Sequence, residues 1–181
     1  FFTIMTDPEE LAHRIQSTGF ACTSCAACCK SGCDDCGTVI VSPPEVRAVM
    51  AQTGLSWDEV AVPYPETIDD GHGGRYTLGW CLRHRDGECR FLKNGRCSIY
   101  ASRPWICRTY PFMLDRDDLV VSACDGIGRP IDAAGALQIA KDLVARQRAE
   151  EDEEMRVGRI LRGAALPAGG VVVIDSEGVK P

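Results

Sequence analysis

The chain has 181 residues, 45% of them hydrophobic, and a formal net charge of −6. This length and composition suit one domain with an apolar core. The acidic balance argues against a nucleic-acid-binding module, which normally carries a basic field. No apolar run approaches the ~20 residues that cross a bilayer, so we expect no membrane span. The opening residues 1–5 are too short for the apolar region of a secretory signal, and Met5 resembles a natural start. We therefore expect a cytoplasmic protein.

Helix signals appear at both ends of the chain and in between. Asp7 and Pro8 favour a first turn, and Gly19 ends that helix. Ser42 starts a second helix, which Gly54 ends. The acidic run at 150–154 is most simply a solvated helix face. The helices expected are residues 7–18, 42–53, a short helix from 56, and a long C-terminal helix from 132 to about 162.

Short β-branched runs predict strands between these helices. The Asn94-Gly95 pair lies between two such runs and is a strong hairpin signal, which would bring Cys89 and Cys97 close together. Residues 63–75 are rich in Pro, Asp and Gly and predict a surface loop. The strands expected are residues 38–41, 75–81, 89–92 with 97–100, 119–122, and an edge strand at 171–174.

These elements predict a small, loop-rich α+β domain with short strands and a long C-terminal helix, organised by metal. We expect an N-terminal helix at 1–19 and a cysteine-cluster metal-binding domain at 20–130. The C-terminal helix and tail, residues 131–181, are expected to pack on that same domain.

Eleven cysteines are the most informative feature of the chain, and six of them fall between residues 22 and 36. Disulfides are one use for them, but cytosolic thiols stay reduced and an odd number leaves one over. Free buried thiols are a second use. Metal ligation is the interpretation we favour, because thiolates are soft ligands for zinc, copper(I) and iron–sulfur clusters.

The spacing within the first cysteines indicates which metal. Cys22, Cys25 and Cys28 form the C-x2-C-x2-C triple that ferredoxins use to hold three corners of one cluster. Structural zinc sites more often use two separated pairs. In an extended backbone, the adjacent Cys28 and Cys29 would point to opposite sides. The pair therefore predicts two centres close together, unless one of the two thiols is buried and unligated.

Two blocks of motifs carry a family resemblance. The first is the CxxCxxCC run from Cys22 to Cys29. The second comprises Cys89-x2-Leu92, Gly95-x-Cys97-x-Ile99-Tyr100, Arg103-Pro104-x2-Cys107-Arg108-x-Tyr110-Pro111-Phe112 and Cys124-Asp125-Gly126-Ile127-Gly128. Over residues 20–128 the chain resembles the CxxCxxCC family of zinc- or iron-chelating domains, also called the YkgJ-like cysteine-cluster family.

The resemblance implies eight shared ligands, enough for two [4Fe–4S] clusters with four thiolates each. As a hypothesis for the first cluster we take Cys22, Cys25, Cys28 and Cys124. The second cluster then takes Cys29, Cys89, Cys97 and Cys107.

Three further cysteines, Cys33, Cys36 and Cys81, depart from the family pattern. They predict a third metal centre, completed by His72, His84 or an outside ligand. A cluster held by three cysteines leaves one iron open to substrate, which would suit an enzyme. The alternatives are a small zinc site or partly free thiols. His13 is expected to be a surface residue.

Residues near Cys107 suggest how a centre is tuned. Arg103 and Arg108 would offset its negative charge, or else form ordinary salt bridges. Trp105, Tyr110 and Phe112 would shield it from water, or else simply pack in the core.

The function expected from these observations is iron–sulfur binding with a redox role, most simply electron transfer to a partner protein. The alternatives are a structural zinc protein that presents an interaction surface, and an enzyme that uses an open-site cluster. The sequence offers no catalytic residue and leaves open whether the protein is an oxidoreductase or an accessory redox protein.

Overall fold

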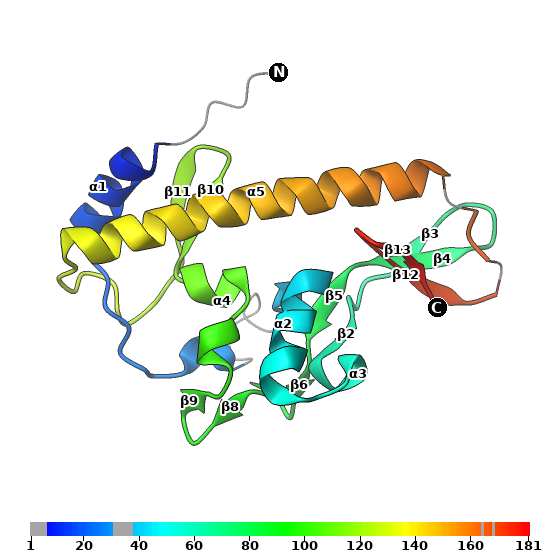
Figure 1. The fold of residues 1–181 in the computed structure, drawn as a ribbon, viewed down its shortest axis with the longest axis horizontal. Helices are drawn as coiled ribbons and strands as arrows, with labels where there is room; N and C mark the ends of the chain where they lie inside the picture. Colours follow the sequence, from blue (N-terminus) through cyan, green and yellow to red (C-terminus); the bar gives the residue numbers. More distant parts are fainter. Residues whose placement is uncertain (1–6, 31–37, 164, 168) are drawn as a thin grey trace. The chain divides into compact units, whose positions relative to one another are not determined.

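The computed structural model describes residues 7–30, 38–163, 165–167 and 169–181. Helices and many short strands share this part of the chain, which confirms the α+β class and the long C-terminal helix (Figure 1). Among the described residues, no helix combines the length and the apolar composition that crossing a bilayer requires.

The chain divides into two compact units, and each unit consists of two separate chain segments. The first unit contains the described residues of Phe1–Cys25 and Trp105–Ala149. The second contains those of Ala26–Pro104 and Glu150–Pro181. The expected boundaries after residues 19 and 130 stay a prediction.

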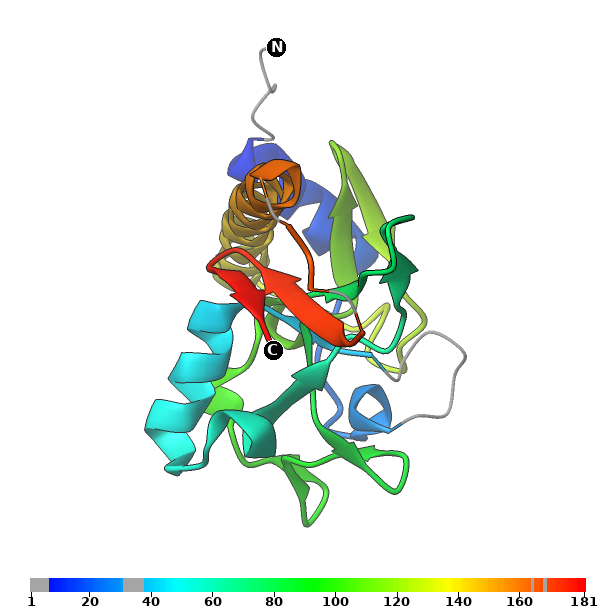
Figure 2. The same cartoon turned by 90° about the vertical axis from the view of Figure 1, so that its right-hand side faces the viewer.

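The first unit is built on helix α1 and the first part of helix α5, which pack side by side (Figures 1 and 2). Leu11 and Ile15 of α1 are fully buried against Ala140 and Leu143 of α5, and Phe112 joins them. The elements are α1 (Pro8–Thr18), α4 (Trp105–Thr109), β10 (Phe112–Asp115), β11 (Asp118–Val121) and residues 133–149 of α5 (Ala133–Gly163).

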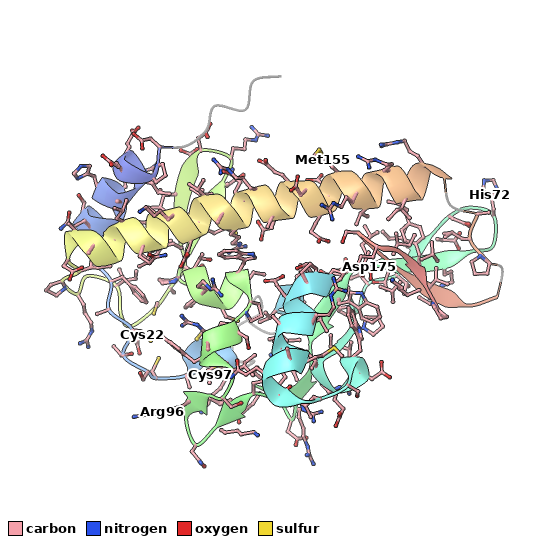
Figure 3. The ribbon with its side chains drawn as sticks, viewed as in Figure 1. Cys22, His72, Arg96, Cys97, Met155 and Asp175 are labelled. Carbon is pink, nitrogen blue, oxygen red and sulfur yellow. The ribbon has the colours of Figure 1, made fainter. Side chains whose placement is uncertain are left out.

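The second unit contains two small sheets and two hairpins. One sheet has the order β1-β5-β2 and the other the order β13-β12-β4-β3. Trp80 Nε1 donates a hydrogen bond of 2.8 Å to the buried Asp175, which is labelled in Figure 3. Its helices are η1 (Ala27–Cys29), α2 (Pro43–Thr53), α3 (Trp57–Val60), η2 (Tyr100–Ser102) and the remainder of α5. Its strands are β1 (Ile40–Val41), β2 (Ala61–Pro63), β3 (Ile68–Asp69), β4 (Arg75–Leu78), β5 (Trp80–Leu82), β6 (His84–Arg85), β7 (Glu88–Cys89), β8 (Leu92–Lys93), β9 (Arg96–Cys97), β12 (Val171–Asp175) and β13 (Gly178–Lys180).

The predicted helix starts are confirmed by their caps. The Asp7 carboxylate accepts the Glu9 N–H at 3.0 Å. Ser42 and Glu45 form a capping box at the start of α2, as the sequence pattern favours. Gly19, with φ of +72°, ends α1 in a conformation that few other residues adopt.

The Asn94-Gly95 turn of the expected hairpin is confirmed, but its strands are shorter than the expected 89–92 and 97–100. Cys89 belongs to β7, which pairs with β6, and Tyr100 begins η2. Strands β8 and β9 pair with Leu92 opposite Cys97, and both turn residues have positive φ. This is the type I′ geometry that matches the strand twist. A second hairpin, β6–β7, turns at Asp86-Gly87 in the same way, and the sequence reasoning missed it.

Two other strand predictions were also wrong in detail. The expected strand at 75–81 is broken at Gly79, where φ is +76°, so β4 and β5 join different sheets. The expected edge strand at 171–174 is instead an interior strand, because β12 pairs with both β4 and β13. The expected loop at 63–75 contains β3, which pairs with β4.

Candidate metal centre

The eight cysteines that the family pattern implies divide evenly between the two units. Each unit contributes its own set of four thiols, and the two sets have different scaffolds. The first unit carries Cys22, Cys25, Cys107 and Cys124. The second unit carries Cys28, Cys29, Cys89 and Cys97.

In the first unit, backbone pairing holds the segments of Cys22 and Cys124 together. Phe20 and Ile127 form an antiparallel bridge. Beside it, the Ala21 N–H donates to the Gly126 carbonyl at 3.0 Å. Figure 3 labels Cys22 on the chain that follows this bridge. The first and last cysteines of the family pattern therefore belong to neighbouring strands of chain.

The β10–β11 hairpin brings the segments of Cys107 and Cys124 to the same end of its ladder. The ladder ends with Phe112 opposite Val121. It is extended by the Ser122 N–H, which donates to the Pro111 carbonyl at 2.8 Å. The Tyr110 hydroxyl then donates to the Ala123 carbonyl at 2.6 Å. The residues after Cys107 thus lie beside those before Cys124.

In the second unit, an antiparallel bridge joins η1 to hairpin β6–β7. Lys30 pairs with Glu88, and their charged side-chain atoms are 3.6 Å apart. Each residue of this bridge is the chain neighbour of a cysteine, Cys29 on one side and Cys89 on the other. The bridge therefore brings the adjacent pair and the hairpin cysteine together.

The two hairpins place Cys89 and Cys97 near each other, as the sequence predicted. Cys97 lies at the end of β9 and is labelled in Figure 3. Burial raises the pKa of Cys89, and the negative charges of Cys97 and Cys28 raise it further. The charges of Cys28 and Cys97 thus act on Cys89 within the second unit.

The Cys28–Cys29 pair does not have the geometry expected of it. Both residues lie in the single 3-10 turn η1 rather than in extended backbone, and their side chains are hydrogen-bonded to each other. The hydrogen bond from Cys29 lowers the pKa of Cys28 to about 6, and the positive charge of Arg103 acts in the same direction. Cys28 and Cys29 therefore need not face two centres on opposite sides of the chain.

Backbone N–H groups point at the sulfur atoms of three cysteines, a feature that sequence reasoning missed. Ser24 donates to Cys22 Sγ and Gly126 donates to Cys124 Sγ, each at 3.4 Å. The Cys89 sulfur accepts from the backbone of Phe91 and Leu92, and these bonds lower its pKa against the effect of burial. In all three cases a donor stands two residues after the cysteine. Such donors stabilise a thiolate.

The cysteine loop also contains strained backbone. Ser24 and Ala26 have φ near +57° and +59°, in the left-handed region that non-glycine residues rarely adopt. The other described non-glycine residues of this kind, Asp86, Asn94 and Arg116, lie in two-residue hairpin turns. Strain in the cysteine loop serves no hairpin, and it shapes the turn around Cys22.

The described thiols of each unit lie on neighbouring chain segments but do not form a complete metal-binding site. Among the described residues, no three His, Cys, Asp or Glu side chains are arranged to hold a metal ion. Cys22, Cys25 and Cys28 are exposed. The donor set nevertheless fits a thiolate-bound metal, since each unit offers four soft ligands on loops and hairpin ends.

The cysteines outside the family pattern differ in environment. Cys33 and Cys36 lie outside the described residues. Cys81 is buried in β5, between Ile40 and Val62 of the flanking strands. Burial raises the pKa of Cys81 to about 11. Cys81 therefore has the environment of a core residue. The third metal centre stays a prediction.

The two histidines named with these cysteines, His72 and His84, both belong to the second unit. His84 Nδ1 lies 3.0 Å from the Leu82 carbonyl, and His84 pairs with Cys89 across β6–β7. His72, labelled in Figure 3, is exposed on the turn between β3 and β4. It lies beside a cavity of about 340 Å³ that Asp69 and Asp70 also line. His13 is exposed on α1, as predicted.

The side chains near Cys107 make cation–π and aromatic contacts, and their roles at a metal centre stay predictions. The Arg103 guanidinium lies 3.5 Å from the centre of the Tyr100 ring and acts on Cys28. The Arg108 guanidinium lies 4.8 Å from the Trp105 ring. Phe112 is 1% exposed and meets Phe20 edge to face at 5.7 Å, so it packs in the core.

Comparison with known proteins gives one match. Residues 21–125 match the model of a family described as "CxxCxxCC: Putative zinc- or iron-chelating domain". Neither the curated proteins nor the solved structures yield a match to the chain. The matched range contains all eight cysteines of the two sets.

Proposed function

Because the chain belongs to the CxxCxxCC family of zinc- or iron-chelating domains, we propose that it binds two [4Fe–4S] clusters and transfers electrons. Each cluster, when bound, would take up and release one electron at a time. The proposal assigns four thiolate ligands to each cluster, the number that such a cluster requires.

The observation that carries this proposal is the set of backbone N–H groups directed at sulfur. Cys22, Cys89 and Cys124 each accept such a bond. Hydrogen bonds to sulfur are among the features that set the reduction potential of an iron–sulfur centre.

We assign the ligands by unit, which revises the partition expected from the sequence. The revision exchanges two residues, Cys28 and Cys107, between the sets. The backbone bridges described above support it, since each bridge joins cysteine segments of one unit. One set is Cys22, Cys25, Cys107 and Cys124. The other is Cys28, Cys29, Cys89 and Cys97.

Arg103 has a defined role in this proposal. Its guanidinium, held over the Tyr100 ring, offsets the negative charge of the thiolates around Cys28. Stabilising the more negative, reduced state raises the reduction potential of the centre. An electron carrier also needs a redox partner protein, which the proposal therefore includes. It includes neither nucleic acid nor a membrane among the partners.

The test is anaerobic purification followed by analysis of iron, zinc and acid-labile sulfide. We expect a brown protein with roughly eight iron and eight sulfide per chain, because each cluster contains four of each. A colourless protein with zinc and no sulfide would replace this function with that of a structural zinc protein. Zinc has no redox chemistry, so the two results cannot be confused.

A further inference from the structure

A buried arginine connects the long helix α5 to the short helix that carries Cys107. Arg146 is only 9% exposed, and its Nη1 donates a hydrogen bond of 3.0 Å to Thr109 Oγ1. Thr109, the last residue of α4, is 1% exposed. Both residues belong to the first unit. The charged end of Arg146 thus lies in the interior and is hydrogen-bonded to a helix of only five residues.

A second hydrogen bond of the same hydroxyl group links the last residue of α4 to its first residue. The Thr109 hydroxyl accepts from Arg146 and donates to the carbonyl of Trp105, the first residue of α4, at 3.0 Å. An isolated helix of this length is not stable in water, because one turn of hydrogen bonds does not repay the cost of nucleation. The orientation of α4 therefore depends on contacts such as this one.

The position of Cys107 gives this contact a consequence for the thiol. Residues two apart on a helix do not face the same side. Anchoring the side of α4 that carries Thr109 to α5 therefore directs Cys107 to a different side. Cys107 remains partly exposed while Thr109 is buried, in agreement with this arrangement.

We propose that Arg146 is a positioning residue for the metal centre of the first unit, acting through Thr109 to fix the direction of the Cys107 thiol. This inference rests on the proposed function. Burying a guanidinium is costly, and an apolar side chain of similar size would pack as well at lower cost. The planar guanidinium instead supplies a directional donor, which fixes a rotation that apolar packing leaves free.

The test compares variants that remove one hydrogen-bonding group with controls that keep it. Thr109→Val keeps the shape of the side chain and removes the hydroxyl, whereas the control Thr109→Ser keeps the hydroxyl. Arg146→Met and Arg146→Lys form a second pair. Each protein is purified anaerobically and analysed for metal content and reduction potential. Alkylation of Cys107 is then timed by mass spectrometry in the metal-free, folded chain.

We expect Thr109→Val and Arg146→Met to lose about half of the bound metal, since one of two four-thiolate centres is affected. Alkylation of Cys107 should accelerate about tenfold, the effect of losing one buried hydrogen bond. Thr109→Ser should resemble the wild type, and Arg146→Lys should recover part of the loss. Full metal content with an unchanged potential in Thr109→Val and Arg146→Met would reduce Arg146 to a purely structural residue.

The alkylation rate separates this inference from the proposed function. If the wild-type protein binds no metal at all, the proposed function fails. Faster labelling of Cys107 in folded Thr109→Val than in Thr109→Ser would still support the positioning role. Equal rates in the two variants would overturn it.

Discussion

The Ala21 N–H donates to the Gly126 carbonyl at 3.0 Å, and this bond sets the segment of Cys22 beside that of Cys124. The approach is so close that a Cβ atom at position 126 would lie 2.5 Å from the Ala21 carbonyl oxygen. Only glycine permits this spacing, so Gly126 determines whether two cysteines more than a hundred residues apart can serve one centre.

Replacing Gly126 by alanine should therefore open the first metal centre. We expect Gly126→Ala to lower the metal-to-protein ratio and to destabilise the chain by about 1–3 kcal/mol, the usual cost of overpacking. Metal analysis and urea unfolding measure the two effects. Gly170→Ala is the control, because a Cβ there has no neighbour within 4 Å. Equal metal content in the two variants would contradict the role of Gly126.

Single cysteine substitutions should each remove the metal of one of the two centres. Cys22→Ser and Cys89→Ser should each remove about half of it, because each thiol belongs to a different set of four. Cys81→Ala should retain all of it, since Cys81 is buried in β5. Loss of metal from Cys81→Ala would instead support a third centre. If neither serine variant changes the metal content, the ligand scheme is wrong.

Double substitutions test the partition by unit. Cys22→Ser with Cys107→Ser should lose no more metal than Cys22→Ser alone, because both residues would serve one centre. Cys22→Ser with Cys28→Ser should lose nearly all of it. The reverse pattern of losses would restore the partition expected from the sequence.

The reactivity of the metal-free thiols should depend on pH in two distinct ways. The pKa of Cys28 falls from 9.0 to about 6, whereas that of Cys81 rises to about 11. Since the thiolate is the nucleophile, alkylation of Cys28 should reach a plateau near neutral pH and that of Cys81 should still rise at pH 10. Mass spectrometry of the labelled, folded chain distinguishes the two. A Cys28 rate that still rises between pH 8 and pH 9 would contradict the shift.

The lowered pKa of Cys28 also determines how the stability of the folded chain changes with pH. Because the pKa of Cys28 is lower in the folded chain than its ordinary value of 9.0, the folded state favours the thiolate. This contribution is fully present above pH 9 and is lost as the pH falls through about 6. Metal-free protein should therefore lose stability as the pH falls from 9 to 6, as urea titrations can show. A Cys28→Ala variant should lose less over that range.

The turn between β8 and β9 should tolerate one substitution and not another. Gly95 has φ of +73°, so Gly95→Val places a β-branched residue in the left-handed region at a cost of about 1–2 kcal/mol. Asn94→Gly keeps a residue suited to its turn position and should be nearly neutral. Urea unfolding compares the two. Metal content should fall in Gly95→Val, because Cys97 lies opposite Leu92 in this hairpin.

Local signals in the sequence predicted those parts of the fold that local chemistry decides. The N-cap at Asp7 and the capping box of Ser42 with Glu45 satisfy the helix ends within a few residues. Asn94-Gly95 likewise specifies its turn by its own backbone preferences. These elements needed no knowledge of distant contacts.

The parts that sequence reasoning missed depend on distant partners. Val171 pairs in parallel with Arg75, a register that no local pattern encodes. Helix α4 is too short to show a hydrophobic period and depends on Arg146, 37 positions further along the chain from Thr109.

For the candidate site, the family motifs identified the eight cysteines, but their grouping could not be predicted. Grouping depends on the bridges at Phe20 and Lys30, whose partners Ile127 and Glu88 are far away in the sequence. The 3-10 turn at Cys28 and Cys29 was also missed, because two adjacent cysteines carry no signal for it.

The two units are interleaved along the chain, since each combines an early segment with a late one. During synthesis, the strand β4 therefore waits for β12, which leaves the ribosome almost a hundred residues later. The hairpins that carry Cys89 and Cys97 close within a few residues and need no such delay. Some of the thiols thus reach their native hairpins while the nascent chain is still growing, and no contiguous fragment contains one complete unit without also containing part of the other.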